Sequence, residues 1–361
     1  MGRYGGGVLA SSFSARRTST TTTTTTTVSS NKIDVVLEAF SSGFEAEVML
    51  AEEETQYRQR CRFSVGGSGA ELHYRVGERR VDSFELASPR INAAMPRILR
   101  TFENLSLGLR AVHFHAPRSL DFPILVSLVY ASPFDEAAWL DAARTLLPEI
   151  HCVGRSKGLT LACDRSSTLE KLFVDDRTFV LEFPEGSFCH PNARANERSL
   201  EWLCARLRDI GECDLLELYC GAANHTVTLA ALCRTVVAVE VDATLVAAAR
   251  RNLDRNGVTN ATVLASDASK YCARLGAKIK NLFDALLVDP PRRGLDPKTR
   301  RILRHYDNVL YVSCNPAALQ TDLDFLAETH QIRSFAVLDA FPRTPHLECL
   351  VHFERKDPAA S

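Results

Sequence analysis

The chain has 361 residues, of which 45% are hydrophobic and 24% are charged, as in an ordinary globular protein with room for two domains. Lys and Arg number 43 against 44 Asp and Glu, so the formal net charge is -1 and a nucleic-acid site would have to be a local basic patch. No apolar run approaches the roughly 20 residues that cross a bilayer, so we expect no membrane partner.

The 11 cysteines never form a C-x-x-C pair, and their number is odd. This pattern argues against a zinc site, an iron–sulfur cluster and a disulfide framework. We therefore expect no metal and no iron–sulfur cluster, and a reducing, intracellular compartment.

The first 32 residues contain no acidic residue, carry Arg3, Arg16 and Arg17, and include an unbroken threonine run from Thr20 to Thr27. Such a segment cannot bury a core. Residues 1–33 are interpreted either as a disordered tail or as a transit peptide. The first interpretation leaves the chain in the cytoplasm, and the second sends it to a mitochondrion or plastid.

Residues 34–185 have the pattern of a mixed α+β domain. Helices are predicted at 35–40, 91–109 and 136–147, and strands at 57–65, 71–76, 124–130, 150–153, 159–162 and 178–183. The first strand alternates basic and apolar residues, which places Arg58, Arg60 and Arg62 on one face. A row of arginines is usually a solvated face, but next to Tyr57 and Phe63 it is also typical of a surface that grips a phosphate backbone.

The second half begins with a repeated β-loop-α-β pattern. A strand at 214–218 is followed by a loop with Gly221, a helix at 225–233, a strand at 235–239 that ends in Glu240, and a helix at 243–256. A glycine turn lets a ligand approach a helix amino terminus, and the carboxylate after the second strand can accept hydrogen bonds from ribose hydroxyls. The three-glycine fingerprint of dinucleotide sites is missing, because Ala223 stands at the next such position. The pattern favours S-adenosylmethionine over a dinucleotide, with a unit that binds nothing as the alternative.

Two further predicted strands are followed directly by residues that could take part in a reaction. The strand at 284–288 runs into Asp289-Pro-Pro-Arg-Arg-Gly294, where Arg292 stands in place of the aromatic residue that an amino-methyltransferase needs. The strand at 310–312 ends before Asn315-Pro316, which places Cys314 at the carboxyl edge of a sheet, where ligands gather. A thiolate there is a candidate nucleophile, although a free cysteine is more often a buried packing residue. A helix at 317–328 and strands at 262–264, 335–338 and 350–353 complete the prediction.

Several ordered motifs together resemble the RNA 5-methyluridine methyltransferases: Leu216-Glu-Leu-Tyr-Cys-Gly221, Asp289-Pro-Pro-Arg-Arg-Gly294, Ser313-Cys-Asn-Pro316 and His346-Leu-Glu348. Residues 57–63 and Arg80-Val-Asp-Ser-Phe84 further resemble the tRNA (uracil-5-)-methyltransferase branch. The likeness covers roughly Ala51 to the end of the chain. rRNA-modifying relatives often carry an added oligonucleotide-binding barrel and a four-cysteine cluster, neither of which is evident here.

The resemblance implies an α/β fold: a class I, Rossmann-like S-adenosylmethionine-dependent methyltransferase domain at 186–361, preceded by an α+β RNA-binding domain at 34–185. It implies C5-methylation of a tRNA uridine, in the T-loop of the T-arm, by a monomeric enzyme. Cys314 would attack uracil C6, which gives C5 carbanion character, and Glu348 would accept the C5 proton after methylation. Arg58, Arg60 and Arg62 become candidate RNA contacts.

The same matching implies cofactor contacts at His190, Tyr219, Asn224, Glu240 and Asp289, with Asp267 as a further adenine-side contact. Two positions depart from the family pattern. His190 replaces a glutamine and cannot offer the paired hydrogen bonds of an amide, and Ala223 replaces a glycine and disfavours positive φ.

Two other functions stay open at this point. One is an rRNA uridine C5-methyltransferase with the same chemistry. The other is a tRNA-binding folding factor that has lost methylation through the changes at His190 and Ala223. The retention of Cys314, Glu348 and Asp289 together argues against that loss.

Overall fold

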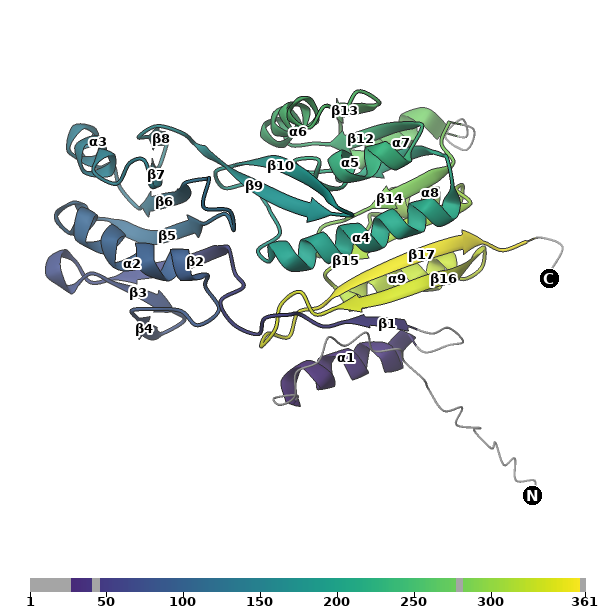
Figure 1. Ribbon diagram of the computed structural model, residues 1–361, viewed down its shortest axis with the longest axis horizontal. Helices are drawn as coiled ribbons and strands as arrows, with labels where there is room; N and C mark the ends of the chain where they lie inside the picture. The colour runs from purple at the N-terminus through teal and green to yellow at the C-terminus, as the bar shows by residue number, and fades with distance from the viewer. Residues whose placement is uncertain (1–26, 41–45, 277–281, 358–361) are drawn as a thin grey trace, which may run out of the picture.

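The structure, a computed structural model, describes residues 27–40, 46–276 and 282–357 (Figure 1). Most of the segment predicted at 1–33 as a tail or transit peptide lies outside these residues, but helix α1 (Thr27–Phe40) already begins within it. Over the described ranges, no helix combines the length and the apolar character needed to cross a membrane.

The front domain is built on one mixed sheet with strand order β4-β3-β2-β5-β6-β7-β8. Its strands are β2 (Arg60–Gly66), β3 (His73–Val76), β4 (Arg79–Val81), β5 (Leu109–His115), β6 (Ile124–Tyr130), β7 (Ile150–Ser156) and β8 (Leu159–Ala162). Helices α2 (Pro89–Phe102) and α3 (Glu136–Arg144) pack on the sheet, and the short 3-10 turns are η1 (Gly69–Glu71) and η2 (Glu103–Leu105). Alternate side chains of the strands point into a core around Phe63, Phe102, Phe114 and Trp139.

The helix predicted at 91–109 is wrong in its second part. Helix α2 ends at Phe102, and Leu109 already begins strand β5. Gly108 has φ +78, in the left-handed region that ends regular structure, and the buried Val112 and Phe114 follow with a period of two. The apolar spacing before Gly108 continues the helical pattern, so periodicity alone placed the boundary too late.

The main sheet has the strand order β1-β16-β17-β15-β14-β11-β12-β13. Its strands are β1 (Ala46–Met49), β11 (Asp214–Leu218), β12 (Thr235–Glu240), β13 (Ala261–Ala265), β14 (Ala285–Val288), β15 (Asn308–Ser313), β16 (His330–Leu338) and β17 (Glu348–Arg355). Strands β11 to β15 pair in parallel, whereas β17 lies antiparallel between β15 and β16. The central strands are apolar runs because both faces of the sheet are covered.

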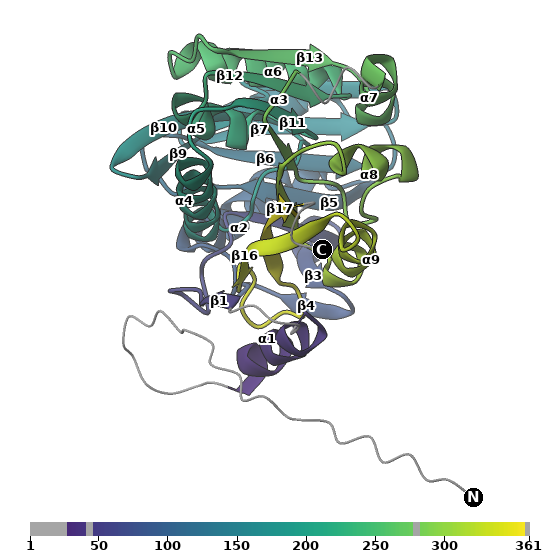
Figure 2. The same ribbon diagram turned by 90° about the vertical axis from the view of Figure 1, so that its right-hand side faces the viewer.

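Helices cover the two faces of the main sheet (Figure 2). One face carries α4 (Ala193–Ile210), α5 (Asn224–Leu229) with the turn η3 (Ala230–Leu232), and α6 (Ala243–Arg255). The other carries α1, α7 (Ala268–Leu275), α8 (Pro297–Leu303) and α9 (Pro316–Leu326). This is the doubly wound α/β arrangement expected of residues 186–361.

Two segments of the range expected for the front domain contribute to the main sheet's core instead. Strand β1 pairs in parallel with β16, and Phe40 of α1 stacks on Phe335 at 5.3 Å between ring centroids. The hairpin of β9 (Ser167–Val174) and β10 (Arg177–Pro184) packs on α4 and α6 through buried side chains such as Leu181. The second domain therefore includes these two segments, which both lie before residue 185 in the chain.

Lys32 of α1 fixes the loop that leads into β17. Its ammonium group donates to the Asp339 carboxylate at 2.6 Å. It also reaches the backbone carbonyls of Phe341, Thr344 and His346 at 3.0 to 3.1 Å. An ammonium surrounded by four oxygens orders a loop that has no regular structure of its own.

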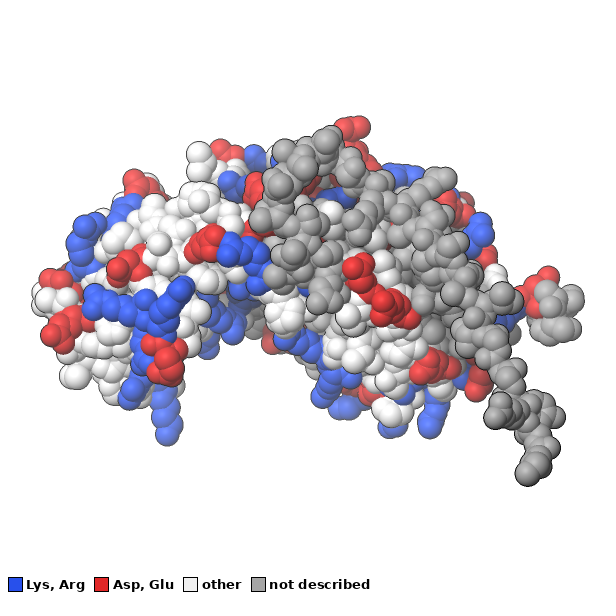
Figure 3. Space-filling model, turned by 90° about the horizontal axis from the view of Figure 1, so that it is seen from below, with Lys and Arg blue, Asp and Glu red and all other residues white. Residues whose placement is uncertain are grey.

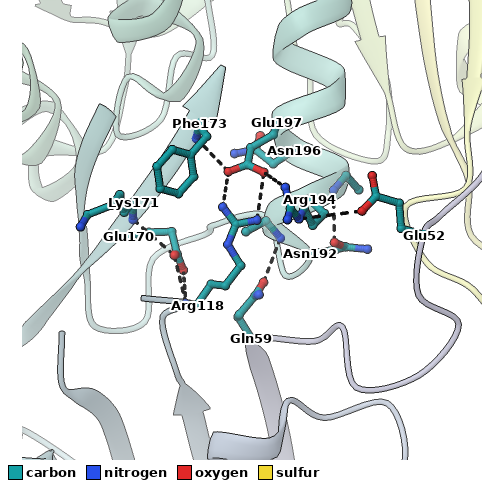
Figure 4. A network of polar contacts seen from close by, with 12 residues as sticks. Glu52, Gln59, Arg118, Glu170, Lys171, Phe173, Asn192, Arg194, Asn196 and Glu197 are labelled. Carbon is teal, nitrogen blue, oxygen red and sulfur yellow. Dashed lines mark hydrogen bonds and ion pairs between the residues drawn. The ribbon is translucent and has the colours of Figure 1, made fainter. Parts of the chain in front are cut away.

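A buried ion pair joins the front domain to the second domain (Figure 4). Arg118, in the loop after β5, makes a two-pronged contact with Glu197 of α4, and one prong measures 2.9 Å. Glu197 also accepts from the backbone N–H of Phe173 at 2.8 Å, and Glu170 accepts from that of Arg118 at 3.1 Å. Burial raises the pKa of Glu170 to about 7, against the lowering effect of the Arg118 N–H.

We predict that Arg118→Met lowers the free energy of unfolding by about 3 kcal/mol, because it removes the main countercharge of the buried Glu197. Urea unfolding followed by circular dichroism measures the change. Arg97→Met is the matched control, since the Arg97–Glu149 pair is exposed and its loss should cost less than about 1 kcal/mol. Equal losses in both variants would contradict a structural role for the buried pair.

Candidate active site

The residues expected to carry chemistry follow the carboxyl ends of the parallel strands. In the sheet register, Leu218 lies opposite both Val239 and Val288, and Val288 lies opposite Tyr311. The strands therefore end together at one edge, which holds Tyr219 after β11, Glu240 at the end of β12, Asp267 after β13, Asp289 after β14 and Cys314 after β15. That edge is where open α/β sheets bind ligands.

Glu348 reaches the same edge from the opposite direction. It is the first residue of β17, and the register pairs Ser313 with Cys349. Because β17 is antiparallel to β15, its beginning lies beside the end of β15, and so Glu348 lies beside Cys314. Glu348 is 8% exposed.

Cys314 differs from most of the other cysteines in its accessibility. Of the 11 cysteines, only Cys314 and Cys163 are partly exposed, and the rest are buried. Burial raises the pKa of the Cys314 thiol, and the Asp289 and Glu348 charges raise it further. The charge and hydrogen bonding of Arg292 oppose this rise. From the sequence, Arg292 served only to exclude methylation of an amino group. Its place in the Asp-Pro-Pro-Arg motif was the available signal that it belongs to the site.

Two buried residues that sequence reasoning missed belong to the same cluster. Glu217 is 1% exposed in β11, and its carboxylate lies 3.6 Å from Nδ1 of His225. Burial lowers the pKa of His225, but the nearby Glu217 carboxylate and the charges of Asp289 and Glu348 outweigh it and raise the pKa. For the carboxyl group of Asp289 burial has the opposite effect and raises the pKa to about 6, although the charge of His225 lowers it. The available signal in the sequence was the carboxylate of Glu217 inside the otherwise apolar run Leu215 to Leu218, because a buried charge needs a partner.

The loop after β11 has an unusual backbone. Tyr219, Gly221 and Ala223 all have positive φ, at 66, 56 and 67°. The left-handed conformation costs an alanine about 1–2 kcal/mol. Glu240 supports the loop by accepting from the backbone N–H of Gly221 at 3.0 Å, and a Cβ added to Gly221 would meet no atom within 4 Å. Ala223 thus adopts the conformation that its side chain disfavours.

The other expected cofactor positions lie at the edge with protein partners of their own. The Asn224 amide exchanges two hydrogen bonds, at 2.9 and 3.0 Å, with the amide of Asn196 in α4. Asp267 caps α7 by accepting from the Lys270 N–H at 2.9 Å. Burial raises the pKa of Tyr219 to about 12.

His190 lies beside Glu348. Its Nε2 is 2.9 Å from a Glu348 carboxylate oxygen, and its Nδ1 is 2.8 Å from the backbone oxygen of Asn192. The ring also stacks on Phe341, with 5.5 Å between centroids. Both ring nitrogens therefore have partners within the chain.

The three arginines of the first strand lie in unequal surroundings. Arg62 is exposed on β2, whereas Arg58 and Arg60 are half-buried. Arg60 reaches the backbone oxygen of Gly186 at 3.4 Å, and the charge of Arg58 acts on His346 in the loop before Glu348. The row thus runs from the front sheet toward the site. In Figure 3, Lys and Arg side chains also lie on the rims of the hollow between the two lobes.

Within residues 27–40, 46–276 and 282–357, no group of three or more His, Cys, Asp and Glu side chains could hold a metal ion. The acidic cluster is instead matched by His190, His225 and Arg292. Such a set of carboxylates, a thiol and their countercharges is suited to covalent and acid–base chemistry.

Comparison with known proteins agrees with the resemblance found in the sequence. A family model described as tRNA (Uracil-5-)-methyltransferase matches residues 23–356. Proteins named tRNA/tmRNA (uracil-C(5))-methyltransferase from Chromohalobacter salexigens and Aromatoleum aromaticum are each 38% identical to this chain. The first match covers 85% of this chain and 88% of that protein, and the second covers 81% and 85%.

A solved structure has the same fold over most of its length. It is the tRNA (uracil-54, C5)-methyltransferase of Pyrococcus abyssi in complex with S-adenosyl-L-homocysteine, with a TM-score of 0.69 at 21% identity. The match covers 89% of this chain and 81% of that one. The fold class predicted from the sequence is confirmed, and so is the resemblance. The chain belongs to the tRNA (uracil-5-)-methyltransferase family.

Proposed function

We propose that this protein methylates C5 of a uridine in tRNA, with S-adenosylmethionine as the methyl donor and Cys314 as a covalent nucleophile. The observation that carries the proposal is the meeting of Cys314, Asp289 and Glu348 at one edge of the main sheet. The three residues come from separate strands, and each has a role in this reaction.

The residues at the edge fit S-adenosylmethionine. Its sulfonium and ammonium groups outweigh its single carboxylate, so it is a net cation, and the edge supplies carboxylates at Glu240, Asp267 and Asp289. The backbone at Gly221 faces open space, which lets a ligand approach closely. When bound, S-adenosylmethionine supplies an electrophilic methyl group.

Cys314 acts on the uracil ring in the first step of the reaction, and Glu348 acts on it after methyl transfer. The Cys314 thiolate adds to C6, and the ring electrons move to give C5 carbanion character. Once C5 carries the methyl group, its proton must leave before the C6–S bond can break. Glu348 is the base we assign to that proton. Arg292 favours the thiolate, because its positive charge opposes the rise in the Cys314 pKa.

We propose that the front domain and the arginine row hold the RNA, with the T-arm uridine as the target. Arg60 and Arg62 lie in β2 and Arg58 lies just before it, Arg60 contacts the backbone of Gly186, and other cations lie beside the hollow (Figure 3). The name of the Pyrococcus abyssi protein refers to uracil 54, which supports the same position here. A uridine in a folded loop must leave its stack to reach a half-buried cysteine.

Incubation with an unmodified tRNA transcript and methyl-labelled S-adenosylmethionine tests the proposal. Label should enter the T-arm uridine, and Cys314→Ala should reduce it at least about a thousandfold while tRNA binding persists. Cys163→Ala, which changes the other partly exposed cysteine, should keep its activity. Label that enters only rRNA, or binding without label, would indicate the alternative functions, and an active Cys314→Ala would exclude the covalent route.

We predict that Glu348→Gln traps the methylated adduct. Removal of the base should slow loss of the C5 proton by about 10²–10⁴-fold, so the C6–S bond persists. A protein band that carries both RNA and methyl label on a denaturing gel measures the adduct. Normal product release without such a band would remove Glu348 as the base.

We predict that cofactor affinity falls as the pH drops below about 6. Asp289, with its pKa raised to about 6, is ionised above that pH and neutral below it, and a cationic ligand prefers the ionised form. Affinity should be constant above pH 6 and fall by up to about tenfold per pH unit below it. Calorimetry between pH 5 and 8 measures this. Asp289→Asn should bind weakly without that slope, and a retained slope would assign it to another group.

A further inference from the structure

We propose that His190 relays the proton that Glu348 takes from C5, so that it serves the base of the reaction and not the cofactor. This inference rests on the proposed function above. It starts from one contact, the 2.9 Å separation between Nε2 of His190 and the Glu348 carboxylate. At that distance a proton on the Glu348 carboxyl group is within hydrogen-bond reach of a bare Nε2.

The backbone of Asn192 can accommodate both tautomers of the imidazole. Its carbonyl oxygen lies 2.8 Å from Nδ1 and accepts a hydrogen bond when Nδ1 is protonated. Its N–H group lies 3.2 Å from the same atom and donates when Nδ1 is bare. The ring therefore keeps a partner at Nδ1 whichever nitrogen carries the proton. A proton can arrive at Nε2 without leaving an unpaired group behind.

The ring is also held rigidly. It stacks on Phe341 at an interplanar angle of 22°. Asn192 is fixed as the amino-terminal cap of α4, since its side chain accepts from the Ala195 N–H and donates to the Ala340 oxygen at 3.1 Å. Contacts on both sides thus keep Nε2 directed at Glu348.

The burial of Glu348 is the reason why a second proton acceptor beside it would help. Glu348 is 8% exposed, so a proton on its carboxyl group has little direct access to water. The surrounding charges are the carboxylates of Asp289 and Glu217, the imidazole of His225 and the guanidinium of Arg292. Only His190 among these contacts Glu348 by a hydrogen bond given by the described structure. The His190 side chain is 11% exposed and that of Glu348 10%, so the proton on the imidazole reaches water only once the site opens.

The proposed step balances as follows. The C5–H bond breaks and its proton goes to the Glu348 carboxylate, while its electron pair forms the C5=C6 double bond. The C6–S bond breaks, and its electrons return to Cys314 as a thiolate. Before the step His190 carries its ring hydrogen on Nδ1, which donates to the Asn192 oxygen, and Nε2 is bare. As Glu348 takes the C5 proton, it passes a proton on to Nε2 in the same step, so C5–H cleavage needs an acceptor at this position. Glu348 regains its charge, and the imidazolium releases its proton to water when the methylated RNA leaves.

Two labels in one single-turnover reaction test the relay. The substrate is a tRNA transcript with tritium at C5 of its uridines, and S-adenosylmethionine carries a ¹⁴C methyl group. Methyl incorporation reports the chemistry before proton loss, and tritium in water reports proton loss itself. In the wild type we expect the two signals to rise together.

In His190→Gln the two signals should separate. Glutamine can fill the position and hydrogen-bond to Glu348, so methyl incorporation should stay within about threefold of the wild type, but it cannot take up a proton. Tritium release should slow by at least about tenfold, with adduct accumulation on denaturing gels. In His190→Ala, added imidazole should restore tritium release, and it should have no effect on the wild type.

His346→Gln is the matched control, because the His346 ring contacts the same Phe341 ring edge-on at 6.2 Å. Its two signals should stay together. A His190→Gln variant whose signals stay together overturns the relay, as does an equal separation in His346→Gln. Since both labels come from one reaction, unfolded protein lowers them equally. If the wild type incorporates no methyl label, the proposed function itself fails.

Discussion

The antiparallel pairing of β17 with β15 is the constraint on which the site depends. Cys314 follows the end of β15, and Glu348 begins β17. If β17 were parallel, its eight residues would carry Glu348 about 25 Å away, to the opposite edge of the sheet. The reversed strand therefore sets the proposed nucleophile and the proposed base side by side. The loop between β16 and β17 must also be ordered, and Lys32 supplies that order through oxygens of the loop.

The cost of this arrangement is electrostatic. Asp289 and Glu348 lie near the Cys314 thiol, and carboxylates disfavour a thiolate. His190 lies beside Glu348 and the charge of Asp289 acts on His225, while the positive charge of Arg292 acts on the Cys314 thiol itself. A thiolate formed in such a place is less populated but more nucleophilic than one with a depressed pKa. Addition to a weak electrophile such as uracil C6 benefits from that reactivity.

The sequence predicted the parts of the site that depend on local pattern. An apolar run that ends in Asp289-Pro290, or in Cys314 before Asn315-Pro316, marks the end of a strand without any knowledge of its neighbours. Contacts between distant segments had no such signal. The packing of the β9–β10 hairpin on α4 and α6 and the contact of Lys32 with Asp339 both join elements that only the folded chain brings together. The helix expected to run to residue 109 failed for a related reason, since β5 is defined by its partners in the sheet.

The two departures from the family pattern affect different parts of the site. Ala223 has a left-handed backbone, with φ 67°, and the loop around it, fixed by Glu240, bears the strain. His190 changes the chemistry at its position, because an imidazole can take up a proton and an amide cannot. The sequence could identify the replacement but not its partner. Since that partner is Glu348, the change bears on the proton removal that we assign to this buried carboxylate.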